Sequence, residues 1–217
     1  STKEMNEYVS NLLTDAIKGD EVKVLTRTDD SVNVVDLLSN EKIEELRKKN
    51  PPLIFVEIVK KILERAISES RKNNFFKSQE YSKRLRKILE KYNDRDNTFA
   101  PESTIVDLVN FAGEMVKDEN EANKLGIFGR ERAFYDALIR DKSAKELLND
   151  ETLKLIAHEL KDVVEEYALT DWPNKESTRA RMRTNIKECL KKYNYPPEYR
   201  KQAVDDVIKQ AEYIMVE

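Results

Sequence analysis

IFVEIVKKILERAISE, residues 54–69, is the stretch of sequence that decides the fold. Its apolar residues return at steps of three and four, which places them in one stripe along one face of an α-helix. Pro51 and Pro52 stand just before this stripe, where the first turn of a helix tolerates a residue without an N–H. The pattern predicts a long amphipathic helix that turns these residues toward a core: Phe55, Ile58, Val59, Ile62, Leu63, Ala66 and Ile67.

Similar stripes continue along the chain and predict further helices. QEYSKRLRKILEKY (79–92), STIVDLVNFAGEMVKDENEA (103–122) and ETLKLIAHELKDVVEEYAL (151–169) all carry apolar residues at helical spacing. LGIFGRERAFYDALI (125–139) joins two glycines to a shorter helix. Short connections between such helices make them antiparallel neighbours, so the expected fold class is all-α, a multi-helix bundle.

The bundle is expected to end in an antiparallel helical hairpin. Its first helix is predicted to begin near Pro173, which suits a first helical turn, and to run to about Lys192. The sequence YNYPP (193–197) then turns the chain, because Pro196 disfavours helix at the residue before it. We expect Trp172, the only tryptophan, to pack on the bundle at the entry to this hairpin.

The N-terminal stretch is less regular. EVKVLTR (21–27) and SVNVVDLL (31–38) are rich in Val, with Thr in the first, and are compatible with short extended segments. We therefore expect residues 1–37 to form a connecting segment and residues 38–217 one helical domain. Because the chain opens on a Ser rather than a Met, we expect it to begin inside a longer protein.

Composition narrows the class of protein. Only 4 Gly and 6 Pro interrupt 217 residues of which 37% are charged, and this balance favours long helices. No apolar run approaches the length of a membrane span, and the first residues do not form a secretory signal, so no membrane association is expected. A single cysteine, Cys189, excludes an internal disulfide framework and indicates a cytoplasmic location.

Charge is segregated along the chain despite a net charge of only -3. Residues 57–95 carry 12 basic and 6 acidic side chains, whereas residues 96–170 carry 9 and 17. Residues 171–217 are again slightly basic, with 10 and 8. Two interpretations remain open: basic and acidic helices attract one another across the fold, or the basic segments face a partner.

The sequence offers little that resembles an active site. It contains no Gly-rich phosphate loop ending in Gly-Lys-Ser/Thr. The only histidine, His158, precedes a Glu as in a zinc-protease motif, but residue 162 is Asp where that motif requires a second His. EVK at 21–23 and ELK at 159–161 match a nuclease triplet that arises by chance in so charged a chain. Cys189 lies on an inward helix face, where a thiol acts as a small hydrophobe. We therefore expect neither a catalytic residue nor a metal or cofactor site in this chain.

Basic residues are the strongest remaining signal. Arg179, Arg183, Lys187 and Lys191 recur every four residues along one helix face, a row that fits a phosphate backbone or a partner. Residues 71–91 interleave further Lys and Arg with aromatic residues, which stack on bases or cap the bundle. The predicted contact residues for a partner or DNA are Arg71, Lys72, Lys77, Lys83, Arg84, Lys87, Arg179, Arg183, Lys187 and Lys191.

Three segments also carry a family resemblance. SRKNNFFKSQEYSKRLRKILEKYNDR (70–95), FYDAL (134–138) and DWPNKESTRARMRTNIKECLKKYNYPPE (171–198) resemble, in that order, the C-terminal region of the restriction (R) subunit of type I restriction-modification enzymes. The resemblance extends from roughly Leu38 to Tyr213 and is most specific in the last third. KKNPPLIFVEIV (48–59) departs from the family pattern, which has an Asn where this chain has the Pro pair.

The resemblance implies a function in assembly rather than catalysis. The family's whole enzyme uses ATP and Mg2+ to translocate double-stranded DNA and to cut it, with the nuclease and motor domains lying upstream of this region. The C-terminal region is expected to dock that subunit onto the methyltransferase subunits. The alternative is a DNA-contacting module that uses residues 71–91 and 179–191. In either case ATP and Mg2+ belong to the parent enzyme, and the partners are the methyltransferase subunits, the motor domains of the same chain, or DNA.

Overall fold

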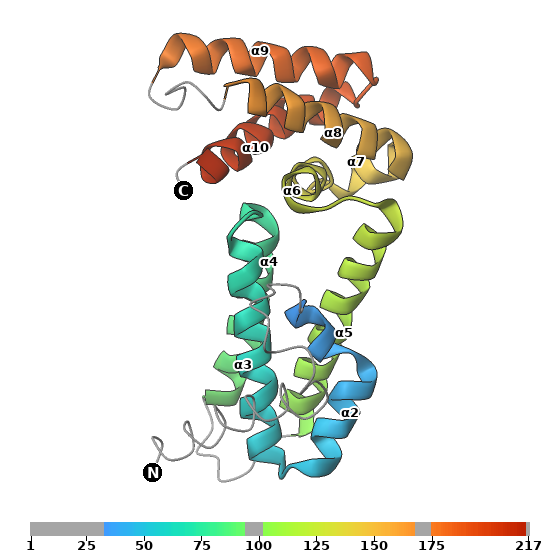
Figure 1. Ribbon diagram of the computed structural model, residues 1–217, viewed down its shortest axis with the longest axis vertical. Helices are drawn as coiled ribbons and strands as arrows, with labels where there is room; N and C mark the ends of the chain where they lie inside the picture. The colour runs from blue at the N-terminus through green and yellow to red at the C-terminus, as the bar shows by residue number, and fades with distance from the viewer. Residues whose placement is uncertain (1–32, 94–101, 168–174, 216–217) are drawn as a thin grey trace, which may run out of the picture. The chain divides into compact units, whose positions relative to one another are not determined.

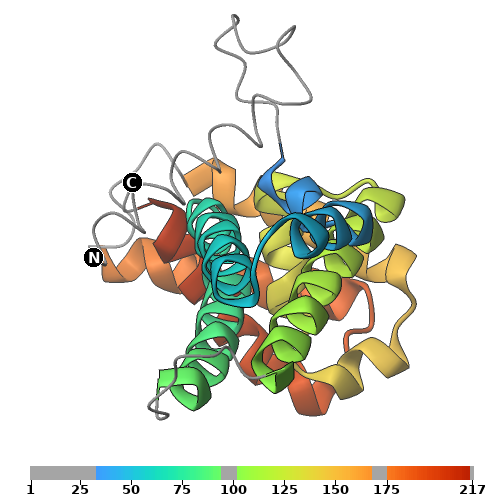
Figure 2. The same cartoon turned by 90° about the horizontal axis from the view of Figure 1, so that it is seen from below.

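A computed structural model describes residues 33–93, 102–167 and 175–215, which form helices joined by short turns (Figure 1). These residues contain nine α-helices, one short 3-10 helix (η1) and no strand, and Figure 2 gives the same picture from below. The predicted all-α class is therefore confirmed. The helices are η1 (Val34–Leu38), α2 (Asn40–Lys49), α3 (Pro52–Arg71), α4 (Phe75–Asn93), α5 (Glu102–Leu125), α6 (Gly129–Leu138), α7 (Lys142–Leu147), α8 (Asp150–Tyr167), α9 (Glu176–Lys192) and α10 (Pro197–Met215).

The chain divides into two compact units. Unit 1 comprises residues 1–67 and 82–119, and unit 2 comprises residues 68–81 and 120–217. The helices α3, α4 and α5 each contribute residues to both units. The boundary expected between residues 37 and 38 falls inside η1 and stays a prediction.

Unit 1 is built around the stripe that the sequence predicts in residues 54–69. All seven residues of that stripe are buried, each with no more than 4% of its surface exposed. The face of α5 that carries Leu108, Phe111 and Ala112 is fully buried as well. Arg47 of α2 donates a hydrogen bond to Glu102 at the start of α5. Asn33 donates one to Glu119, the last residue of α5 that belongs to unit 1.

Unit 2 has one continuous apolar core made chiefly by α6, α8, α9 and α10. Helix α6 packs against α8 and α10, and α9 packs against both α8 and α10. The predicted antiparallel hairpin is thus confirmed as α9 and α10. Its inward residues Met182, Ile186, Val204 and Val207 are buried.

Two helices end in the same hydrogen-bonded turn, which requires a residue with positive φ. After α9, Asn194 has φ 54°, the N–H of Tyr195 donates to Leu190 O (2.9 Å) and the N–H of Asn194 donates to Lys191 O (3.0 Å). This pattern is a Schellman motif, and it satisfies carbonyls that would otherwise lack a partner. Gly126, with φ 67°, closes α5 in the same way.

One prediction near the N-terminus is wrong. Residues 34–38 form the 3-10 helix η1 rather than an extended segment, because the Asn33 side chain accepts a hydrogen bond from the N–H of Val35 (3.1 Å) and caps a turn. The segment 21–27, Trp172 and Pro173 lie outside the described residues. In the part of the chain that the structure describes, no helix is both long enough and apolar enough to cross a membrane.

Candidate partner and nucleic-acid contact surfaces

The basic row of α9 is largely engaged inside the hairpin. Arg179 forms an ion pair with Glu212 of α10 (2.6 Å), and Arg183 forms one with Asp205 of the same helix (2.6 Å). Lys191 pairs with Glu188 one turn earlier (3.1 Å). Lys187 is exposed. The two arginines therefore join α9 to α10, and only the second half of the row points to solvent.

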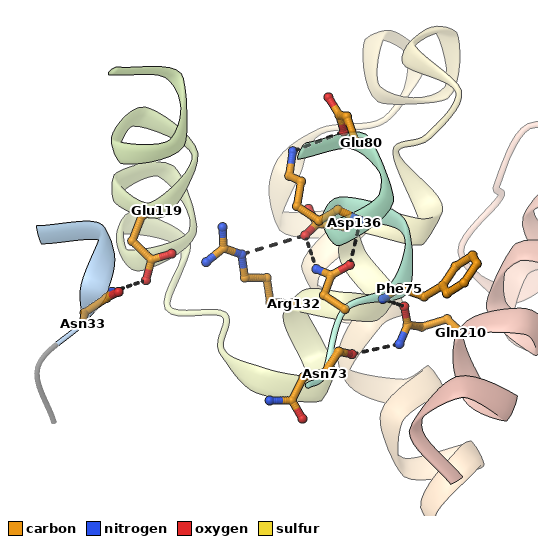
Figure 3. A network of polar contacts seen from close by, with 10 residues as sticks. Asn33, Asn73, Phe75, Glu80, Glu119, Arg132, Asp136 and Gln210 are labelled. Carbon is orange, nitrogen blue, oxygen red and sulfur yellow. Dashed lines mark hydrogen bonds and ion pairs between the residues drawn. The ribbon is translucent and has the colours of Figure 1, made fainter. Parts of the chain in front are cut away.

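The turn between α3 and α4 is held by side chains of α6 and α10. The fully buried amide of Gln210 accepts from the N–H of Phe75 and donates to Asn73 O, both at 2.9 Å (Figure 3). Asn74 caps α4 by accepting from the N–H of Lys77 (3.1 Å), and its amide donates to Asp136 of α6 (2.6 Å). Four backbone or amide groups of this turn thus have partners within unit 2.

The aromatic side chains between residues 71 and 81 also help to pack the α3–α4 turn within unit 2. The ring of Phe75 lies 5.2 Å from that of Tyr213 of α10, and the guanidinium of Arg140 lies 4.2 Å above the ring of Phe76. Lys77 lies over the ring of Tyr81 (5.4 Å). Of the two alternatives for these aromatics, the contacts favour the one in which they cap the bundle.

The basic residues of this turn have partners of their own. The carbonyl of Arg71 accepts from the Tyr213 hydroxyl (2.5 Å), and Lys72 pairs with Glu69 (2.7 Å). Lys77 lies 3.7 Å from Glu80. These three predicted contact residues lie in unit 2 together with the α9 row, whereas Lys83, Arg84 and Lys87 lie in unit 1.

In unit 1, the second half of α4 divides its cations between two faces. Arg84 pairs with Glu114 of α5 (2.7 Å) and lies 5.6 Å above the ring of Phe111, so it serves the packing of α4 on α5. Lys83 and Lys87 are exposed on the face opposite the core. Arg86, which is not among the predicted contact residues, is exposed on that same face. A step of three residues from Lys83 would have placed it there.

A polar cluster joins α8 to the end of α9. Glu159 accepts from Lys192 (2.6 Å) and from the Tyr193 hydroxyl (2.8 Å). Burial opposes ionisation, but these two hydrogen bonds outweigh it and lower the pKa of Glu159 below its ordinary value. Cys189 is buried beside this cluster, and burial with the nearby Glu159 charge raises its pKa to about 12. The cluster therefore holds helices together and leaves the thiol unreactive.

A buried carboxylate, that of Asp206, lies at the centre of α10. Asp206 accepts from Arg140, which follows the end of α6 (2.5 Å), and from Gln202 (2.9 Å). Burial raises the pKa of Asp206 above its ordinary value even though these two donors act in the opposite direction. Tyr195, from the turn before α10, donates its hydroxyl to Leu138 O (2.8 Å). Both groups fix α6 against the final hairpin.

Among the described residues, the groups that resembled catalytic fragments do not gather into a site. His158 is exposed, with its two ring nitrogens each 3.7 Å from a different carboxylate, those of Glu131 and Asp162. Glu159, the acidic residue of the ELK triplet, is engaged by Lys192 and Tyr193. Within the described ranges, no three His, Cys, Asp or Glu side chains are placed to hold a metal ion.

Three large apolar side chains of unit 2 are exposed to solvent. Phe128 at the start of α6, Leu147 in α7 and Leu155 in α8 have 61%, 61% and 53% of their surfaces exposed. Val106 of α5, at 45%, is the corresponding residue in the described part of unit 1. Exposed apolar side chains mark a site of association when they gather into a contiguous patch.

Comparison with known proteins relates the whole chain to one family. Residues 1–217 match the family described as type I restriction enzyme HindI endonuclease subunit-like, C-terminal. The chain is 32% identical over 184 residues to the type I restriction enzyme HindI endonuclease subunit of Haemophilus influenzae, an alignment that covers 83% of this chain and 17% of that protein. It is 29% identical over 159 residues to a protein of Methanocaldococcus jannaschii provisionally named type I restriction enzyme MjaIXP endonuclease subunit, covering 73% and 15%. The chain thus spans less than a fifth of either relative, and no solved structure matches it.

Proposed function

We propose that this chain, which belongs to the type I restriction enzyme HindI endonuclease subunit-like C-terminal family, docks its parent subunit onto the methyltransferase core. The family membership carries this proposal, because the matching region is the C-terminal part of a subunit in a multi-subunit enzyme. In this scheme the parent subunit is the ATP-dependent DNA translocase and endonuclease, and the assembled enzyme acts in the cytoplasm.

The chemistry of restriction is assigned to the rest of the parent subunit. The sequence contains no phosphate-binding loop for ATP, and the described residues contain no carboxylate cluster for Mg2+. We infer that ATP and Mg2+ are bound by other parts of the parent subunit. Its own contribution is to provide a folded surface that fixes the motor and nuclease relative to the methyltransferase subunits.

The segment from α6 to α8 offers the surface best suited to docking. Phe128, Leu147 and Leu155 are exposed apolar side chains of the kind that a specific interface buries at its centre. Charged residues lie near these three residues in the sequence. One of them is Arg130, whose guanidinium lies 3.6 Å from the carboxylate of Glu165. An apolar centre with a polar rim is the usual composition of a protein–protein interface.

A calorimetric titration of the chain against the assembled methyltransferase subunits tests the proposal. We expect the triple variant Phe128→Ser, Leu147→Ser and Leu155→Ser to weaken binding about tenfold or more, because the interface loses its apolar anchors. The substitution Val106→Ser is the matched control and should change the affinity less than about twofold. Phe128 occupies the N-cap position of α6 without a side-chain cap bond, so Ser there favours folding. The absence of binding by the wild-type chain at roughly tens of micromolar would contradict the docking function.

A further inference from the structure

The outward face of α4 in unit 1 is a compact set of cations. Lys83, Arg86 and Lys87 are spaced by three and four residues, so they lie on one side of the helix. They are exposed, whereas Leu85 and Ile88 on the opposite side are buried in the core. We call these three residues the α4 basic face.

These cations differ from their neighbours on the same helix. Arg84 and Lys91 are directed toward α5, where they pair with Glu114 (2.7 Å) and Asp107 (3.6 Å). None of the three residues of the α4 basic face forms an ion pair with the residues that the structure describes. Their charge is therefore not used to hold α4 in place, and it is presented to solvent.

The composition of the face selects the kind of partner. Protein interfaces need an apolar centre and are depleted in Lys, and the exposed large apolar residue in the described part of unit 1, Val106, belongs to α5. A phosphate backbone needs only cations. Lys83 and Lys87 are separated by about 6 Å along the helix axis, because each residue of an α-helix adds about 1.5 Å. This separation is close to the distance of about 7 Å that two phosphate steps of one strand span along the axis of duplex DNA.

We propose that the α4 basic face binds the phosphate backbone of nucleic acid without reading its sequence. Lys83 and Lys87 supply point charges, and Arg86 supplies a fork of N–H donors that suits a phosphate. Glu90 follows one turn after Arg86 on the same side and limits the face at its C-terminal end. This contact is separate from docking, which uses residues of unit 2.

Fluorescence anisotropy with a labelled duplex of mixed sequence, measured from about 50 to about 200 mM salt, tests the proposal. The variant Lys83→Gln, Arg86→Gln and Lys87→Gln should weaken binding at least about tenfold at low salt. It should also reduce the slope of log K against log salt by about 2 to 3, because each phosphate contact contributes about 0.9. The substitution Glu90→Gln should strengthen binding. Gln preserves helix propensity, and circular dichroism verifies that each variant is folded.

The matched control removes the same charge from unit 2. Lys124, Lys142 and Lys145 are exposed, and their joint substitution by Gln should leave the affinity within about twofold and the salt slope unchanged. Equal losses in the two triple variants would overturn the proposal in favour of a net-charge effect, as would the absence of duplex binding by the wild-type chain. A variant of the α4 basic face that binds duplex normally but loses the methyltransferase subunits would assign the face to a protein partner instead. If the chain does not bind the methyltransferase subunits but binds duplex DNA as expected, the docking proposal fails and the proposal for the α4 basic face stands.

Discussion

Glu159 shows at the scale of one residue how a contact between helices makes stability depend on pH. Its pKa is held below the ordinary value of 4.5 by hydrogen bonds from Lys192 and Tyr193. A carboxylate whose folded pKa is depressed stabilises the native state above its unfolded pKa, and that stability is lost as the pH falls through the folded pKa. We therefore expect Glu159→Gln to lower the melting temperature at pH 7, with the difference from wild type shrinking below about pH 4.

Thermal unfolding followed by circular dichroism at several pH values checks this expectation. Glu188→Gln is the matched control, because Glu188 makes only a surface pair with Lys191 one turn away. It should leave the pH dependence nearly unchanged. A melting temperature of Glu159→Gln that stays equally far below wild type at acid pH would show that packing, and not the ionised carboxylate, links α8 to α9.

For the candidate contact residues, the sequence predicts the direction of a side chain around its helix but not the residue with which it pairs. Helical spacing is enough to assign Lys83 and Lys87 to one outward face, because spacing fixes direction around a helix axis, and both are exposed. It did not reveal that Arg84, Arg179 and Arg183 pair with acidic residues on other helices. Those pairs depend on which helix lies opposite, a property of the tertiary fold that no local pattern records.

At the scale of elements, the turn between α9 and α10 depends on one residue in a left-handed conformation. Asn194 adopts φ 54°, which Asn and Gly tolerate but a β-branched residue does not. We expect Asn194→Val to reduce the free energy of unfolding by about 1–2 kcal/mol, whereas Asn194→Gly should change it by less than about 0.5 kcal/mol. Urea unfolding midpoints of the two variants measure the difference. Equal destabilisation by Val and Gly would mean that the Asn side chain, and not its backbone, matters.

The length and the apolar period of each helix explain which elements could be predicted from the sequence. The helices α3, α4, α5, α8, α9 and α10 are long and carry a clear apolar period, so sequence alone located them. The helices α2 and α7 were not predicted, because each buries a single apolar residue, Ile43 and Ala144 respectively. The cap of η1 is a single hydrogen bond from the N–H of Val35 to the Asn33 side chain. The extended prediction rested instead on the preference of Val for strands.

At the scale of the whole molecule, the two units have separate cores. Leu108 is fully buried in unit 1, and Leu160 is fully buried in unit 2. Replacing either with Ala should cost about 2–5 kcal/mol through lost burial and a residual cavity. Hydrogen exchange read by mass spectrometry should show faster exchange in residues 33–67 and 82–119 for Leu108→Ala, and in residues 120–215 for Leu160→Ala. Equal acceleration throughout the chain for both variants would indicate one cooperative unit.

This division could not be deduced from the sequence. No change of composition or flexible linker marks it, because α3, α4 and α5 continue through residues 67, 82 and 119 without a break. Charge segregation gave a partial signal: the basic residues 57–95 include the α4 basic face. Which of those charges belong to each unit depends on long-range contacts.

Cys189 has a practical consequence for experiments on the assembled enzyme. It is the only thiol in this chain, it is buried, and its pKa of about 12 leaves roughly one thiol in ten thousand or fewer ionised at neutral pH. A maleimide or spin-label reagent should therefore pass over it and react with a cysteine introduced at an exposed position such as Lys187 or Lys124. This chain therefore supplies an unreactive background for site-specific labelling, and Cys189 itself does not need to be removed.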